Sequence, residues 1–191
     1  MDALQLDALR EMATIGAGNA ARALSELYGD RRVTVRTPAV QVVPLARVAE
    51  AVGGDRPVSA VVMPVAGTGG WMGLVFFDDG LEQLCRPLVP DSEDDLLRSG
   101  MVEVGNITLT AYLDALAAFT DRPLRPGIPE LVEDSAASLM TSLLAAAQRV
   151  TDVILMAAQF ELDGSHLEGQ LLFLPEEEDL QALFRRLGMD L

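Results

Sequence analysis

The chain has 191 residues, and its 29 acidic against 14 basic residues give a formal net charge of −15. This charge excludes a protein that binds nucleic acid by neutralising phosphates, and one that anchors to an anionic membrane through basic side chains. One cysteine, Cys85, and one histidine, His166, exclude an internal disulfide and a Cys/His zinc site.

The first half of the chain alternates between helical and strand patterns. Apolar residues recur at helical spacing from Leu4 to Leu27, which predicts a long amphipathic helix over 3–28. The later elements of this half are strand structure at 33–43, a short helical patch at 45–52, strands at 58–65 and 71–77 that form a hairpin, and a helix at 81–88.

The second half repeats this order. Its predicted elements are a long helix at 93–119, a strand at 124–133, a helix at 136–148, strands at 150–161 and 167–174, and a helix from Glu176. Individual positions agree as well, because Glu11 matches Glu103 and Met63 matches Met156. His166 is expected in a turn.

We therefore expect an internally duplicated α+β fold, α-β-α-β-β-α written twice. A mainly antiparallel sheet and two long adjacent helices would be related by a pseudo-twofold axis. The chain, 1–191, would form a single domain made of two repeats, 1–90 and 91–191. A chance match of element order between two α+β halves is the alternative.

The expected location follows from two segments. The longest uncharged stretch of the second half, 135–148, is shorter than the roughly 20 residues that span a bilayer. The N-terminus has no basic region followed by an apolar one, so no signal or transit peptide is expected. A cytoplasmic protein without membrane insertion is predicted.

The segment Gly16-Ala-Gly-Asn-Ala-Ala matches the dinucleotide pattern G-x-G-x-x-A, which requires a preceding strand. Residues 7–15 have a helical period instead, so the motif lies inside a helix. Each helical glycine there loses about 1 kcal/mol relative to alanine, and close packing of Gly16 and Gly18 against another element explains them better than a nucleotide.

The second long helix carries three polar residues on one side. Ser99, Glu103 and Asn106 are spaced i, i+4, i+7, which places them on a single stripe of the helix. On spacing alone, the solvated face of an amphipathic helix is the favoured interpretation of this stripe.

The pattern Asp/Ser-x3-Glu-x2-Asn-x22-Pro resembles the signature of the CheC, CheX and FliY family of chemotaxis phosphatases. Ser99, Glu103, Asn106 and Pro129 satisfy every position of it. The phrases Ile15-Gly-Ala-Gly-Asn-Ala-Ala and Glu103-Val-Gly-Asn-Ile resemble the first and second long helices of this family. The likeness extends over essentially the whole chain and implies a CheC-like duplicated fold.

The first half carries a degenerate copy of the motif. Asp7, Glu11 and Thr14 keep the spacing, but threonine replaces the asparagine and Pro38 arrives one residue late. A threonine reaches less far and lacks the paired donor and acceptor of an amide, so we expect this first site to be weak or silent. Asp7 and Glu11 could still bind a receiver nonproductively, or form a relic exposed face.

The resemblance implies a phosphatase that hydrolyses the aspartyl phosphate of a CheY-type response regulator. Phosphoryl transfer to water passes through a loose transition state, so positioning and charge placement suffice. By resemblance, Asn106 would hydrogen-bond the attacking water and Glu103 would pair with a lysine of the receiver. Pro129 would shape the rim of the site, and Ser99 would either orient the Glu103 carboxylate or be a plain surface serine.

The resemblance also implies which partners the chain has. Magnesium is carried by the phosphorylated receiver domain, so no cofactor or metal site of this chain's own is expected. The alternative function is a regulatory adaptor that binds the receptor deamidase CheD with little catalysis. The uncharged helix at 136–148 would offer the contact surface, unless it is a buried core helix. A FliY-like motor component is a third possibility.

Overall fold

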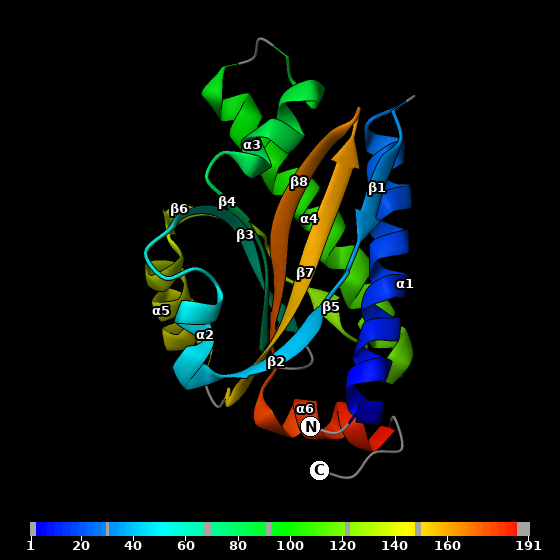
Figure 1. The fold of residues 1–191 in the computed structure, drawn as a ribbon, viewed down its shortest axis with the longest axis vertical. Coiled ribbons are helices and arrows are strands. Elements are labelled where there is room, and N and C mark those ends of the chain that lie inside the picture. The colour runs from blue at the N-terminus through cyan, green and yellow to red at the C-terminus, as the bar shows by residue number, and fades with distance from the viewer. Residues whose placement is uncertain are drawn as a thin grey trace.

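The computed structural model describes residues 3–29, 31–66, 70–90, 93–120, 123–147 and 150–186. An antiparallel sheet lies between two helical layers (Figure 1), with α1 (Ala3–Leu27) and α4 (Asp94–Thr120) on one face and α2 (Val48–Ala51) and α5 (Ala136–Ala146) on the other. The other elements are β1 (Val33–Arg36), β2 (Val40–Pro44), η1 (Leu45–Arg47), β3 (Pro57–Ala66), β4 (Gly70–Phe77), α3 (Gly80–Cys85), η2 (Arg86–Leu88), β5 (Arg125–Pro126), β6 (Glu130–Ser135), β7 (Asp152–Leu162), β8 (Ser165–Leu174) and α6 (Glu177–Arg186). This architecture confirms the predicted α+β class with two long adjacent helices.

The two long helices pack against each other and run in opposite directions (Figure 1). Gly16 permits this approach, because a Cβ atom there would lie 2.7 Å from Cδ1 of Tyr112 on α4. The close-packing prediction is thus confirmed for Gly16. It is wrong for Gly18, which faces solvent and has no neighbour within 4 Å of its added Cβ. The helix α1 ends before Gly29, whose positive φ of 69° turns the chain toward β1.

Each strand predicted ahead of a short helix is split in two. The segment 33–43 forms β1 and β2, and 124–133 forms β5 and β6. Pro38 interrupts the first pair and Gly127 to Pro129 the second, because proline has no N–H to give to a ladder. Each half therefore has the order α-β-β-α-β-β-α rather than α-β-α-β-β-α.

The two halves exchange strands within one sheet. Its order is β1-β7-β8-β4-β3-β5, with β2 also on β7 and β6 also on β3. The first strands of each half thus pair with the hairpin of the other half, and β4 meets β8 at the centre. Strands β1 to β4 of the first half correspond to β5 to β8 of the second half. If each strand is replaced by its counterpart, the strand order of the sheet is unchanged except that it is read from the opposite edge. That is the order that a duplication would produce, and the repeats 1–90 and 91–191 stay a prediction.

Two hydrophobic cores flank the sheet. The first lies between the sheet and α1 with α4, and the second between the sheet and α2 with α5. In the described part of 136–148, Ala136, Leu139, Met140 and Leu143 are buried as in a core helix, and the solvent side carries small or hydroxyl side chains. A contact of that solvent side with CheD stays a prediction.

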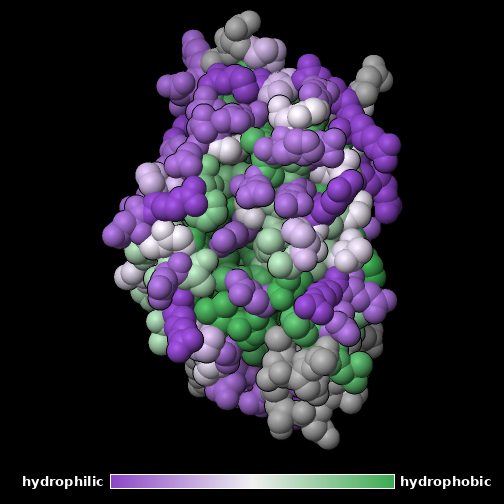
Figure 2. All heavy atoms as spheres, viewed as in Figure 1, coloured by the Kyte–Doolittle hydropathy of each residue, from purple (hydrophilic) through white to green (hydrophobic). Residues whose placement is uncertain are grey.

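The β7–β8 hairpin turns at Asp163 and Gly164, which both have positive φ, so His166 lies in β8 rather than in the turn. The turn expected between β3 and β4, at 67–69, lies outside the described residues. None of the described helices is long and apolar enough to cross a bilayer. In Figure 2, hydrophilic side chains gather at the upper right, over the end of α1 and β1, and hydrophobic ones around β2.

Candidate functional site

The second stripe, Ser99, Glu103 and Asn106, lies on the solvent side of α4. Ser99 and Glu103 are exposed and Asn106 is partly buried. The opposite side of the helix is fixed against the sheet, because a Cβ atom on Gly105 would lie 2.4 Å from Cβ of Val61 in β3. The stripe therefore stands on a helix that has no room to move toward the sheet.

Two polar contacts lie in the first turns of α4, where this stripe begins. Ser99 Oγ donates to the backbone oxygen of Asp95 at 2.9 Å, so its proton is engaged by its own helix. This contact favours a surface serine over one that orients Glu103. Arg98 forms an ion pair with Glu133 of β6, which ties the first turns of α4 to the edge of the sheet.

Pro129 lies directly before β6 and is partly buried. Gly127 fixes this segment by donating its N–H to the Pro64 oxygen at 2.8 Å. Val61 links the segment to the stripe, because it lies opposite Leu131 of β6 and also packs against Gly105 of α4. The structure thus places the motif proline at the sheet edge beside the helix that carries Glu103 and Asn106.

A groove of about 420 Å³ runs between α1 and α4, and Asn106 lines it. We call it the helix groove; its lining residues are Asn19, Arg22, Ala23 and Glu26 of α1, and Asn106, Ile107, Thr110, Ala111 and Asp114 of α4. Sequence reasoning missed the α1 wall. The helical spacing of Asn19, Ala23 and Glu26 could have shown that they share a face, but not that this face borders Asn106.

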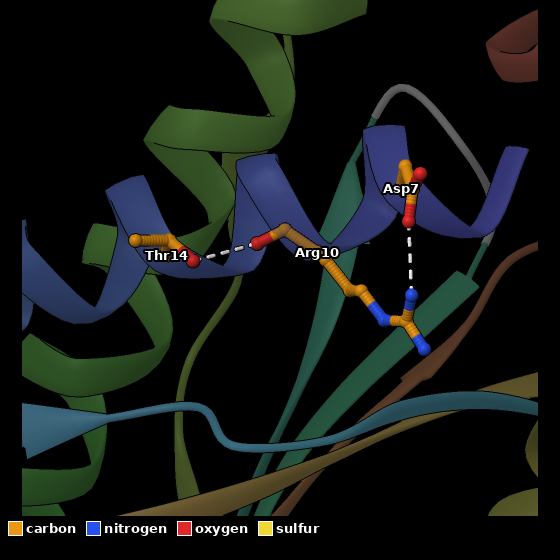
Figure 3. A network of polar contacts seen from close by, with 3 residues as sticks. All are labelled: Asp7, Arg10 and Thr14. Carbon is orange, nitrogen blue, oxygen red and sulfur yellow. Dashed lines mark hydrogen bonds and ion pairs between the residues drawn. The ribbon is translucent and has the colours of Figure 1, made fainter. Parts of the chain in front are cut away.

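The first stripe, Asp7, Glu11 and Thr14, is exposed on α1. Arg10 Nη1 lies 2.9 Å from Asp7 Oδ1, and Thr14 Oγ1 donates to the backbone oxygen of Arg10 at 2.8 Å (Figure 3). Both polar ends of this stripe are therefore engaged within α1. Sequence reasoning missed Arg10, although its i, i+3 spacing from Asp7 is a known signal for an ion pair.

Tyr112 of α4 packs against Gly16 of α1 and reaches the segment between β1 and β2. Its hydroxyl lies 2.7 Å from Thr37 Oγ1, and burial raises the pKa of Tyr112 to about 12. The phenol is thus neutral near pH 7, and its hydrogen bond connects α4 to the segment between β1 and β2. Within the described ranges, no three or more His, Cys, Asp or Glu side chains lie close enough together to hold a metal.

A family model matches part of the chain, and a relative matches nearly all of it. The model of the CheC-like family matches residues 4–42, from α1 to β2. The CheY-P phosphatase CheC of Bacillus subtilis (strain 168) is 30% identical over 201 aligned residues, which cover 98% of this chain and 95% of that protein.

Solved structures show the same fold at lower identity. Thermotoga maritima FliY superposes with a TM-score of 0.77 at 15% identity, covering 98% of each chain. The middle domain of FliM from H. pylori gives a TM-score of 0.70 at 13% identity, covering 94% of this chain and 98% of that one.

Proposed function

Because the chain belongs to the CheC-like family, we propose that it stimulates hydrolysis of the aspartyl phosphate of a CheY-type response regulator in chemotaxis. The name of the Bacillus relative, CheY-P phosphatase, supports the reaction class. The observation that carries the proposal is the placement of Asn106, at the edge of the helix groove and one turn from an exposed carboxylate, Glu103.

Asn106 acts by positioning water. Its side-chain oxygen accepts a hydrogen bond from the water and its NH₂ can donate one, so one amide can hold the water in line with the phosphorus. The water oxygen then bonds to phosphorus, the bond to the aspartyl oxygen breaks, and a carboxylate and inorganic phosphate are released. The loose transition state of phosphoryl transfer does not need a strong base, so an amide suffices.

Glu103 acts by docking. It lies three residues before Asn106, a rise of about 4.5 Å along the helix, so both side chains reach the same partner from adjacent turns. An ion pair between Glu103 and a lysine of the receiver would fix the register in which Asn106 enters the receiver's active site. The receiver supplies magnesium, which neutralises charge on the phosphoryl group, and this chain supplies the water-positioning amide.

The test is the decay of a phosphorylated receiver with magnesium present. We expect the wild-type protein to accelerate decay, and Asn106→Ala to abolish the acceleration while its free energy of unfolding stays within about 1 kcal/mol. Gln41→Ala, which removes an exposed amide of β2 outside the helix groove, is the control and keeps the acceleration. If no receiver from the same genome decays faster, the phosphatase proposal is wrong, and binding to CheD becomes the function to measure.

A further inference from the structure

The helix groove has one wall from each half of the chain. We propose that this groove is part of the docking surface for the phosphorylated receiver, and that Arg22 of α1 is its main cationic contact. The inference rests on the proposed function, because that function places Asn106 inside the receiver's active site. The first half would then contribute directly to the intact site, although its own motif is degenerate.

Asn106 connects the two surfaces. It belongs to the second stripe and also lines the helix groove, so a partner that encloses Asn106 must come up against the opposite wall. That wall presents Asn19, Arg22, Ala23 and Glu26 along the last turns of α1. The groove is therefore continuous with the surface on which the receiver is proposed to dock.

Arg22 is an exposed cation on this wall. Its Nη2 donates to Asn19 Oδ1 at 3.2 Å, a neutral acceptor that orients the guanidinium along α1 without neutralising it. Five other arginines pair with carboxylates (Arg10, Arg31, Arg56, Arg86 and Arg98), whereas Arg22 has no ion pair in the described part of the chain. A guanidinium remains charged at all relevant pH values and binds carboxylate or phosphate oxygens through several donors.

The groove also carries two carboxylates, Glu26 and Asp114. One cation among carboxylates does not collect anions in general, since the net charge of the lining is negative. This arrangement of charges selects a partner that places an acidic group against Arg22 and keeps its other acidic groups away from Glu26 and Asp114. A phosphorylated receiver fits this pattern, because its phosphoryl oxygens lie at the point that Asn106 faces, on the groove that also carries Arg22.

The shape of the groove allows a test that leaves its charges unchanged. Ala23 is a small, partly buried residue of the α1 wall, and an indole at this position would occupy space inside the 420 Å³ groove. Ala23→Trp should therefore block a docking partner by volume alone. Arg22→Glu should block it by charge alone.

The experiment measures the affinity of the full chain for a receiver activated with beryllofluoride, by fluorescence anisotropy of a labelled receiver. We expect Arg22→Glu and Ala23→Trp each to weaken binding by about tenfold or more, as for charged and steric changes inside an interface. The matched controls are Arg47→Glu and Ala46→Trp, two exposed positions in η1 on the opposite layer, which should leave the affinity unchanged.

The outcomes separate this inference from the proposed function. If the wild type binds and dephosphorylates the receiver, but both groove variants bind like the wild type, the groove is not a docking surface and the function stands. If the wild type binds without accelerating dephosphorylation, the function is wrong, and the groove variants still decide the inference. If the wild type does not bind any receiver from the same genome, both are wrong.

Discussion

The two acidic stripes are expected to differ in function, because only Glu103 of the second stripe is proposed to dock the receiver through its charge. Glu103→Gln keeps the size of the side chain and removes its charge, so we expect KM for the phosphorylated receiver to rise about tenfold while kcat is nearly kept. Steady-state rates over a range of receiver concentrations measure both constants. Glu11→Gln, the same change on the first stripe, is the control and should leave both unchanged. A fall in kcat with an unchanged KM would mean that Glu103 takes part in the chemical step.

Arg10 gives the first stripe a cation that the second stripe lacks. By the match of Glu11 with Glu103, Arg10 corresponds to Val102, so a receiver lysine that approached Glu11 would meet a like charge beside it. In an Asn106→Ala background, we therefore expect Thr14→Asn alone to restore almost no phosphatase activity, and Arg10→Val with Thr14→Asn to restore part of it. The measurement is the decay rate of the phosphorylated receiver with each variant.

This rescue also tests the geometry of the first stripe. Pro38 stands one residue late in the first copy, and a displaced rim of even 1 Å can cost about a hundredfold in rate. Equal rates for the single and the combined variant, both shown to be folded, would mean that charge is not what silences this stripe. The displaced rim would then be the cause.

Alanine substitutions at two helical glycines should change the free energy of unfolding in opposite directions. Gly105→Ala puts a Cβ atom against Val61 and must move α4, so we expect a loss of about 1–3 kcal/mol in the free energy of unfolding. Gly18→Ala meets open space and improves helix propensity, so it should gain about 1 kcal/mol. Urea unfolding of both variants checks the signs. Equal effects would mean that the contact of α4 with β3 is looser than the structure shows.

The helices and strands could largely be predicted from the sequence, because their signals are local. Apolar periodicity predicted α1 and α4, and alternation predicted β7 and β8, although the turn between these strands lies at Asp163 and Gly164 rather than at His166. The breaks at Pro38 and Pro129 were missed although proline is a known interruption, because the alternating residues on both sides dominated the pattern. The exchange of strands could not be predicted, since β-pairing between distant segments leaves no local pattern. The α1 wall of the helix groove was missed for the same reason.

At the scale of the whole molecule, the strand exchange makes each half incomplete. The fragment 1–90 lacks β7, the partner of β1 and β2, and it also lacks β6, which pairs with β3. We therefore expect fragments 1–90 and 91–191 to be unfolded or aggregated alone, and to fold when they are mixed. Circular dichroism and size-exclusion chromatography of each fragment and of the mixture test this. A folded monomeric fragment 1–90 would contradict the pairing.

Three buried groups make the fold sensitive to alkali. Burial raises the pKa of Cys85 and Tyr112 to about 12 each, and that of Tyr28 well above its ordinary value. In the unfolded chain these groups lose their protons from about pH 8.5 to 10, so the unfolded state binds fewer protons there than the native state. The free energy of unfolding should therefore fall as the pH rises from about 9 to 12. Urea titrations across this range measure it, and Tyr112→Phe should show a shallower fall than the wild type.

The pairing of strands between the two halves also determines when β1 can fold during synthesis on the ribosome. Val33 pairs with Leu162, so β1 has no partner until the chain has grown through most of its second half. At about 5–20 residues per second, this wait lasts roughly 6 to 26 seconds. During that time β1, β2 and the outer edge of β3 present unpaired backbone groups to other chains. The nascent protein should therefore depend on chaperones more than two independent domains of the same total length would.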